Sequence, residues 1–529
     1  MRCRRLVCKV PTRVRWFAWF PRPSGLGRLA TVAPFAERTP RGPPPCACIA
    51  PLGNHSGDCT THATAPGRGG VHSRMKETTT LMSTTHSAPG GPSPAGPSPT
   101  DPPSSGPATH GAGTAPKGGS RPAATSHTAP AAPPLQQRLA AGAALAIVGL
   151  VSWVLLAHGA QQAVLAGLGV ALGLTLYHAR FGFTSSFRQL LSVGQGEGLR
   201  AHALMLATAS VLFAPILLLG GGLFGVETAG YVAPVGVSVV VGAFLFGIGM
   251  QLGGACASGT LFAVGGGHTA VAITLVSFIA GSVLGAWHWG WWTQELAWLG
   301  FGPVSLADTP AGAPGGLALT LLALGLVWWW AGARTRRTGA PARSQPPSAA
   351  GFARVLRGSW PLWVGALALA GLNALVLLTS GRPWGVTGAF ALWGSRIAES
   401  VGVPVRSWAY WQGDRALPLD APLLADTTTL LNVGIILGAL LAAAVGGTFA
   451  LHRRLPARTV AAAVLGGLLM GYGARLAYGC NIGAYFGGIA SGSLHGWLWG
   501  ALALAGTYVG LRVRPWFGLR NPKPSDSVC

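Results

Sequence analysis

Apolar stretches of about 20 residues recur along the chain between residues 139 and 512, and short polar connections separate them. The hydrocarbon core of a bilayer needs a helix of about 20 apolar residues to span it. The pattern predicts ten membrane-spanning helices, at residues 139–158, 161–179, 199–219, 232–253, 268–289, 315–333, 360–380, 428–450, 457–476 and 494–512. We therefore expect an all-α polytopic membrane protein.

Shorter stretches bounded by glycine or polar residues lie between these spans, at residues 184–192, 257–264, 387–401 and 482–490. They are too short to cross a bilayer. Irregular backbone at membrane depth is tolerated only where it is buried in protein or lines a cavity. We therefore expect four re-entrant or in-plane half-helices.

Charged residues make up only 9% of the chain, and their distribution predicts its orientation. Arginines gather in the connections on one side, whereas tryptophans and most acidic residues gather on the other. Because cytoplasmic loops collect basic residues, both termini are expected to be cytoplasmic. The formal net charge of +24 is spread over these loops and the N-terminal region and forms no single basic face, so we expect no nucleic-acid partner.

Composition divides the chain into five segments. Residues 1–134 are rich in Arg and then in Pro, Gly, Ser and Thr, which is typical of disorder. Met75 and Met82 are alternative starts, in which case the preceding residues are an over-extended reading frame. The other segments are a first transmembrane half, a basic cytoplasmic linker, a second transmembrane half and a C-terminal tail, at residues 135–333, 334–358, 359–515 and 516–529.

The two halves contain matching motifs. The segment from Gly247 to Gly259 and the segment from Gly471 to Gly483 each end an apolar run in a glycine-rich break with one cysteine at the same place. The motif at residues 181–184, FGFT, is likewise echoed by WGVT at residues 384–387. Five predicted spans separate these two motifs, so the halves are expected to lie in opposite orientations. Inverted repeats with broken helices are a recurrent transporter architecture, with the substrate path at the repeat interface.

Cys256 and Cys480 are the candidate functional residues, because they are the only cysteines in the apolar body. A single intramembrane cysteine is usually a small buried hydrophobic residue. Two cysteines at matched positions favour a function, and the symmetry predicts that both lie near the midplane. The neighbouring candidates on the same path are Gly254, Ser258, Gly259, Gly479, Asn481, Gly483 and Arg475.

The chemistry of these breaks favours an anion that contains sulfur or selenium. Backbone N–H groups at the start of a short helix attract anions. A thiol is a weak S–H donor and a soft partner, which suits a polarizable sulfur atom better than phosphate. Arg475 either holds the anion or extends its side chain to the membrane surface. The histidines, His495 among them, are expected to lie at helix ends, and we expect neither a metal site nor a cofactor.

The segment from Gly471 to Trp497, GYGARLAYGCNIGAYFGGIASGSLHGW, closely resembles the signature of the YeeE/YedE family. The segment QLGGACASGT at residues 251–260 resembles that family's first-half signature, and the similarity covers roughly residues 140–515. The resemblance implies an hourglass-shaped inverted-repeat protein in the bacterial inner membrane that takes up sulfur compounds, thiosulfate above all. It also implies that Cys256 and Cys480 relay the anion through transient S–H to sulfur hydrogen bonds.

The resemblance leaves parts of the function open. Some members are assigned to selenium traffic, and members often work with a separate TusA-like sulfur-carrier protein. A third cysteine, found near the entrance in some members, has no matching motif here. The leading hypothesis is a passive or facilitated, channel-like transporter for thiosulfate, not an enzyme. The sequence has no ATP-binding loop, so we expect no direct ATP drive. The predicted spans contain no acidic residues for a proton relay, which argues against obligate proton coupling. The alternative is a membrane-embedded sulfurtransferase that carries persulfide on a pore cysteine, which needs an activated thiolate.

Overall fold

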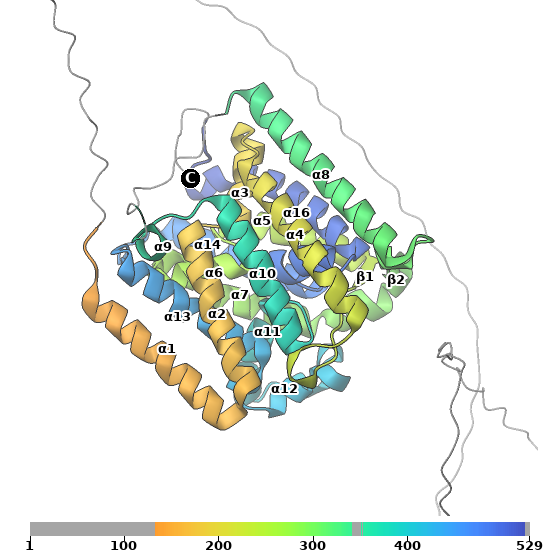
Figure 1. Cartoon of the computed structure of the whole chain (residues 1–529), viewed down its shortest axis with the longest axis horizontal. Helices are drawn as coiled ribbons and strands as arrows, with labels where there is room; N and C mark the ends of the chain where they lie inside the picture. The colour runs from red at the N-terminus through yellow and green to blue at the C-terminus, as the bar shows by residue number, and fades with distance from the viewer. Residues whose placement is uncertain (1–132, 341–350, 352, 524–529) are drawn as a thin grey trace, which may run out of the picture. The chain divides into compact units, whose positions relative to one another are not determined.

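The computed structural model describes residues 133–340, 351 and 353–523 (Figure 1). These residues belong to one compact unit of the chain, Gly118–Cys529. The predicted N-terminal disorder and the two alternative starts lie outside the described residues. The middle of the predicted linker and the last residues of the predicted tail lie outside them too.

A helix forms over each predicted span, and the all-α prediction is confirmed. The long helices are α1 (Gln137–His158), α2 (Ala160–Ala179), α4 (Glu197–Leu219), α5 (Val237–Leu252), α7 (Thr269–Trp287), α8 (Gly312–Thr338), α10 (Leu362–Ser380), α13 (Thr427–Val445), α14 (Ala457–Leu476) and α16 (Leu494–Val513). The short helices are α3 (Phe183–Val193), α6 (Ala257–Gly265), α9 (Ala353–Arg357), α11 (Thr387–Ser400), α12 (Leu417–Asp420), the π-helical η9 (Asn481–Gly487) and α15 (Gly488–Ala490).

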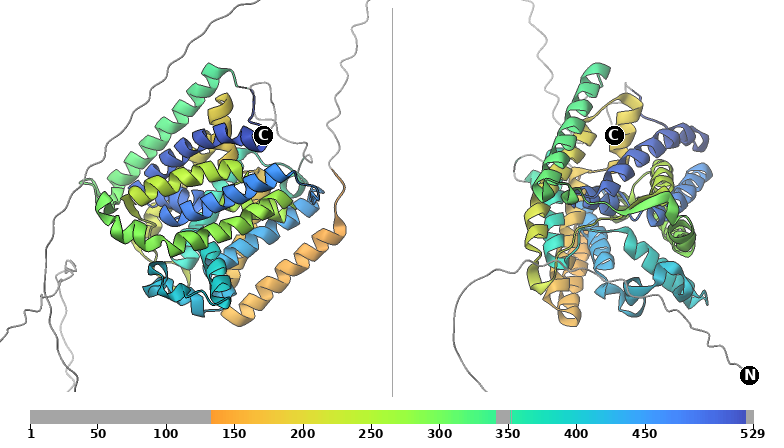
Figure 2. Two further views of the ribbon diagram at one scale, coloured as in Figure 1. Left: turned by 180° about the vertical axis from the view of Figure 1, so that it is seen from behind. Right: turned by 90° about the vertical axis from the view of Figure 1, so that its right-hand side faces the viewer.

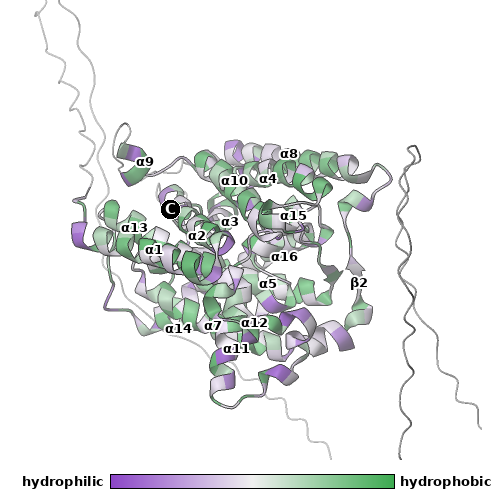
Figure 3. Cartoon of the chain, turned by 60° about the horizontal axis from the view of Figure 1, so that its bottom comes forward, coloured by the Kyte–Doolittle hydropathy of each residue, from purple (hydrophilic) through white to green (hydrophobic). Residues whose placement is uncertain are grey.

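Nine helices in the described part of the chain are long and apolar enough to cross a membrane, which makes this a multi-pass membrane protein. The predicted tenth span, at residues 494–512, is present as α16 but is not among the nine. Its sequence contains glycine, tryptophan, histidine and tyrosine among the leucines and alanines, which lowers its hydropathy. In Figure 3 the long helices are mostly green, and the purple residues lie mainly at helix ends and in connections.

One predicted span is shorter than expected at its start. Residues 232–236 do not extend α5, because β1 (Pro234–Gly236) precedes it and pairs antiparallel with β2 (Gly300–Pro303). Pro234 has no backbone N–H to donate and is disfavoured inside a helix, which fits this boundary.

The long helices form two rows. In one row, neighbouring helices pack in the order α8, α4, α10, α2, α13 and α1. In the other row the order is α16, α5, α14 and α7, which lie side by side when the molecule is seen from behind (Figure 2). The short helices α3, α6, α11 and η9 contact members of both rows or one another. This arrangement places both cysteine segments between the rows.

The contacts come in pairs that a twofold repeat would produce. The packing of α5 against α16 is matched by that of α14 against α7, and the packing of α4 against α10 by that of α13 against α2. In the same way α4 packs on α8 and α13 packs on α1, and α1 and α8 lie on opposite edges in Figure 1.

Glycines of the cysteine motifs allow this close packing. A Cβ atom on Gly247 of α5 would lie 2.3 Å from the carbonyl oxygen of Ala503 in α16. A Cβ atom on Gly471 of α14 would lie 2.2 Å from the carbonyl oxygen of Phe278 in α7. Any larger side chain would clash at these two positions. Small residues let membrane helices pack this closely, so the matched glycines are packing positions.

Candidate functional site

Each cysteine caps the start of a short helix after a break. Cys256 precedes α6 and Cys480 precedes η9, and both have extended backbone. The two side chains are buried, at 2% and 1% exposure, and belong to the same core cluster. Helices α6 and η9 contact each other, so the breaks meet between the helix rows.

The Cys256 sulfur lies among hydrogen-bonding groups of its own half. Its Sγ is 3.6 Å from the hydroxyl oxygen of Ser258. The backbone groups of Gly259 and Phe183 also interact with this thiol. The first N–H groups of a helix have no partner within the helix, so an N-cap side chain can accept from them.

The Cys480 sulfur has a matching position in the second half. The backbone N–H of Ile482 donates to Cys480 Sγ over 3.4 Å, and the backbone of Gly483 interacts with the same thiol. In both halves the residue three positions after the cysteine is therefore a glycine whose backbone reaches the sulfur. The predicted site residues Gly259 and Gly483 are equivalent in this respect.

Hydrogen bonds from the next long helix fix each break. The Thr274 hydroxyl donates to the carbonyl oxygen of Gly253 over 3.1 Å, and His495 Nε2 donates to that of Ala477 over 3.0 Å. Gly253 and Ala477 each lie three residues before their cysteine. His495 does lie at a helix end, but it is fully buried and holds the backbone of the break.

The second break is held at two further carbonyl groups. The Tyr231 hydroxyl donates to the carbonyl oxygen of Tyr478, and Trp499 Nε1 donates to that of Gly479 over 3.3 Å. The three carbonyl groups directly before Cys480, those of residues 477–479, are therefore all fixed by side chains from outside the break.

The residue two positions before each cysteine has a left-handed backbone. It is Gly254 in the first half, at φ 81°, and Tyr478 in the second half, at φ 56°. Glycine adopts this conformation without strain, whereas an aromatic residue rarely does. Gly254 is thus required by backbone geometry, and Tyr478 keeps a strained conformation next to the site.

A cavity of about 680 Å³ reaches the second break. Gly479, Gly483 and Arg475 line it. The other predicted site residues do not, namely Cys480 and Asn481 of the second half and Gly254, Cys256, Ser258 and Gly259 of the first. A Cβ atom on Gly483 would meet nothing within 4 Å, but one on Gly259 would lie 3.3 Å from Cys256 Sγ. Gly483 in the second break therefore borders open space, whereas Gly259 in the first break is packed against its own thiol; Gly254, earlier in the first break, is exposed.

Arg475 lies in the wall of this cavity. Its side chain is only 5% exposed, and its Nη1 donates to the Tyr410 hydroxyl over 2.5 Å. That burial does not fit the alternative in which the side chain extends to the membrane surface.

Asn481 is fully buried next to Cys480. Neither its amide nitrogen nor its amide oxygen has a hydrogen-bond partner among the described residues. Most buried polar groups in proteins are paired, so this amide is available to a polar species on the path.

The repeat motif WGVT at residues 384–387 also lines the cavity, whereas the sequence did not indicate three other residues of its lining. Tyr410 and Arg415 come from the connection between α11 and α13, and Trp289 follows α7. Nothing in their spacing relates them to either cysteine motif. Their only signal was the unusual density of aromatic and charged residues at positions 406–415.

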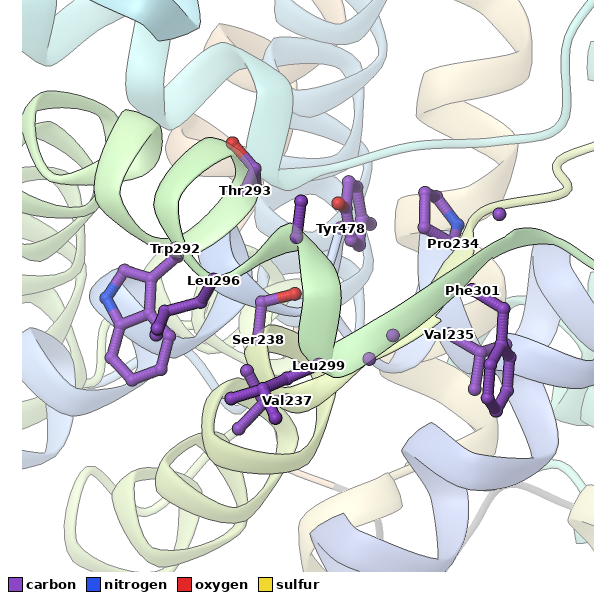
Figure 4. A pocket seen from close by; sticks show the side chains of 14 residues that line it. Pro234, Val235, Val237, Ser238, Trp292, Thr293, Leu296, Leu299, Phe301 and Tyr478 are labelled. Carbon is purple, nitrogen blue, oxygen red and sulfur yellow. The ribbon is translucent and has the colours of Figure 1, made fainter.

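A second cavity of about 240 Å³ lies beside the two-stranded sheet of β1 and β2 (Figure 4). Ser238, Thr293 and Tyr478 contribute hydroxyl groups to its lining. Tyr478 lines both cavities, so its ring lies in the wall between them.

Comparison with known proteins agrees with this arrangement. A family model described as sulphur transport matches residues 178–509. The thiosulfate transporter TsuA of Spirochaeta thermophila is 30% identical over 350 residues, which cover 63% of this chain and 92% of that protein. The thiosulfate transporter TsuA of Escherichia coli is 27% identical over 345 residues, 63% of this chain and 90% of its own length.

A shorter match covers one part of the chain. The probable transporter YedE of Salmonella typhimurium is 35% identical over 141 residues, which is 27% of this chain and 32% of that protein. The family model and the full-length relatives together cover both cysteine segments and the helices that position them. The chain therefore belongs to the sulphur transport family, the YeeE/YedE family that its cysteine segments resemble.

Proposed function

We propose that this protein takes up thiosulfate, or a related small sulfur-containing anion, and passes it from the cavity to Cys480 and then to Cys256. The observation that carries the proposal is the matched pair of buried thiols, each at the start of a short helix whose backbone reaches the sulfur. The relatives named as thiosulfate transporters support the choice of anion.

The arrangement suits an anion that carries both oxygen and sulfur. The positive end of a helix stabilises negative charge, and the unpaired amide of Asn481 can donate to an anion. A thiol donates only a weak hydrogen bond, so it holds a polarizable sulfur atom without trapping it. Because both thiols lie in contacting elements, the anion can leave Cys480 and reach Cys256 by a short step.

We propose that the two cysteine halves are inverted repeats in the bacterial inner membrane, with both termini cytoplasmic. The matched helix contacts support this, and they favour grouping α8 with the second half because its packing on α4 parallels that of α1 on α13. On this orientation the large cavity faces outward. A separate TusA-like sulfur-carrier protein is the proposed recipient on the cytoplasmic side.

Growth of a sulfur-auxotrophic bacterium on thiosulfate tests the proposal. The parent chain should support growth, and Cys256→Ala and Cys480→Ala should each abolish it. Cys529→Ala is the matched control, because this cysteine lies at the chain end outside the apolar body, and it should grow like the parent. Growth of both pore variants at the parental rate would contradict the relay.

The same cells distinguish the alternatives. Uptake of selenium compounds in place of thiosulfate would indicate a selenium transporter. A persulfide trapped on Cys480 or Cys256 during turnover, detected by mass spectrometry, would instead indicate a sulfurtransferase.

A further inference from the structure

Two arginines share one aromatic ring in the wall of the large cavity. The guanidinium carbon of Arg475 lies 5.6 Å from the centre of the Tyr410 ring, and that of Arg415 lies 5.5 Å from the same centre. Arg415 also lies 5.1 Å from the ring centre of Trp289. Both arginines and both aromatic residues line the cavity.

Neither arginine is neutralised by a carboxylate within the described part of the chain. The ion pairs found there join Arg406 to Glu399 and to Asp420. Asp426 also lines the cavity, but its carboxylate caps α13 by accepting from the backbone N–H of Thr429 over 2.7 Å. Asp414 lines the cavity and forms no ion pair with either arginine. Two like charges held on one ring repel each other, and an anion between them would relieve that repulsion.

Arg475 has unused hydrogen-bonding capacity. Its side chain is 5% exposed, and its buried Nε has no partner among the residues that the structure describes. Guanidinium groups present several N–H donors in a fixed plane, which matches the oxygens of an oxyanion. Arg475 lies four residues before Gly479, so an anion held there is next to the break that leads to Cys480.

We propose that Arg415 and Arg475, positioned by Tyr410, form a recruitment site that selects doubly charged oxyanions before the thiols select for sulfur. Sulfate and thiosulfate carry the same charge and similar oxygens, so both bind at this site. Sulfate has no terminal sulfur for the thiols to hold, so it competes with thiosulfate without being transported. A singly charged anion such as thiocyanate interacts with only one arginine and binds more weakly.

Only the link to thiosulfate passage rests on the proposed function, since binding of a doubly charged anion can be measured alone. The experiment uses the full chain in lipid nanodiscs and measures binding of radiolabelled sulfate, thiosulfate and thiocyanate. Arg415→Gln is the main variant because this residue is exposed, so its replacement should leave the fold intact. It should weaken sulfate and thiosulfate binding alike, by about tenfold or more.

Four further variants test the second arginine and control for folding and for general charge. Arg475→Gln should weaken binding at least as much, and Arg475→Lys should restore part of it if charge rather than packing matters. Arg382→Gln removes another charge from the lining of the same cavity, and it should change binding less than twofold. Cys480→Ala should leave sulfate binding unchanged.

The outcomes separate this inference from the proposed function. Sulfate binding that depends on Arg415, in a protein that fails to transport thiosulfate, would support the recruitment site and overturn the transport proposal. Thiosulfate uptake without measurable sulfate binding would overturn the recruitment site alone. Equal effects of Arg382→Gln and Arg415→Gln, or thiocyanate binding as tight as that of sulfate, would also overturn it.

Discussion

The breaks before Cys256 and Cys480 share a backbone plan but differ in what surrounds them. Each has a left-handed residue two positions before the cysteine and a fixed carbonyl group three positions before it. The first break lies against Phe183, in an aromatic cluster with Phe187, His202 and Tyr485. The second borders a cavity of about 680 Å³. Both thiols are buried in the same position of their half, and the halves differ in the cavity that borders the second break.

The cavity beside the second break arises from a difference in length between matching connections of the two halves. The connection between α3 and α4 is only Gly194–Gly196, whereas residues 401–426 join α11 to α13. The longer connection supplies Tyr410 and Arg415 to the cavity wall. The two halves thus share the backbone geometry of the breaks, while the second half also has a cavity lined by arginine and aromatic residues.

The largest stability difference between the breaks is expected on removing the side chains that fix them. His495→Ala leaves the buried carbonyl oxygen of Ala477 without a partner, which costs about 1–3 kcal/mol. Thr274→Val removes the matching bond to Gly253 and should cost less, because Thr274 can be replaced by a residue of nearly its own shape. Thermal unfolding of the purified variants measures both, and a His495→Ala protein as stable as the parent would contradict this role.

A smaller effect is expected at the left-handed residues. Gly254→Ala forces a Cβ atom into a left-handed backbone and should destabilise the protein by roughly 1–2 kcal/mol. Tyr478→Gly removes the same strain from the second break, so it should lose less stability than truncation of a half-buried tyrosine normally costs. Denaturation of the two variants under identical conditions measures both losses of stability. A Gly254→Ala protein with parental stability would show that the first break can relax.

The two equivalent glycines should respond differently to an added methyl group. Gly259→Ala brings a Cβ atom to 3.3 Å from Cys256 Sγ and 3.0 Å from the Ala255 side chain, so it should displace the thiol and lower uptake severalfold. Gly483→Ala meets nothing within 4 Å and should retain most of the uptake. Initial uptake rates at matched expression test this, and the reverse order of effects would argue against the geometry of the breaks.

The smallest effect is expected in the long connection of the second half. Arg406 pairs with Glu399 and Asp420, and this pairing lowers the pKa of Asp420 from its ordinary value. A lowered pKa stabilises the fold above the ordinary value, about pH 4, and that contribution is lost as the pH falls through the lowered value. Since Asp420 is exposed, only a slight acid-dependent loosening of this connection is expected. Hydrogen exchange of residues 401–426 should show it in the parent and not in Asp420→Asn; identical profiles would exclude it.

Much of the fold followed from the sequence because apolar length and glycine breaks report directly on membrane helices. The short helices were placed within a residue or so, for example α6, which begins at Ala257 as expected. The tenth span, α16, was less apolar than its length suggested, and β1 shortened α5. Hydropathy alone does not reveal a short strand that begins with proline, such as β1, or the lower apolar content of a glycine-rich helix, such as α16.

The candidate site was predictable only where the repeat marked it. Cys256 and Cys480 stood out because matched motifs carry them, and Arg475 because it lies within the second motif. Tyr410 and Arg415 approach Arg475 through tertiary packing of a connection with no counterpart in the first half. Likewise, no local pattern indicated that Tyr231 and Trp499 hold the carbonyl groups before Cys480.

In the proposed transport path, the soft thiols of both breaks pass the anion along. Flux of radiolabelled thiosulfate into proteoliposomes containing Cys256→Ser or Cys480→Ser tests it most directly. Serine keeps the size and the hydrogen-bond donor but replaces the soft sulfur with a hard oxygen. We predict that each single variant loses most of the flux while sulfate binding persists. Parental flux through either serine variant would contradict the claim.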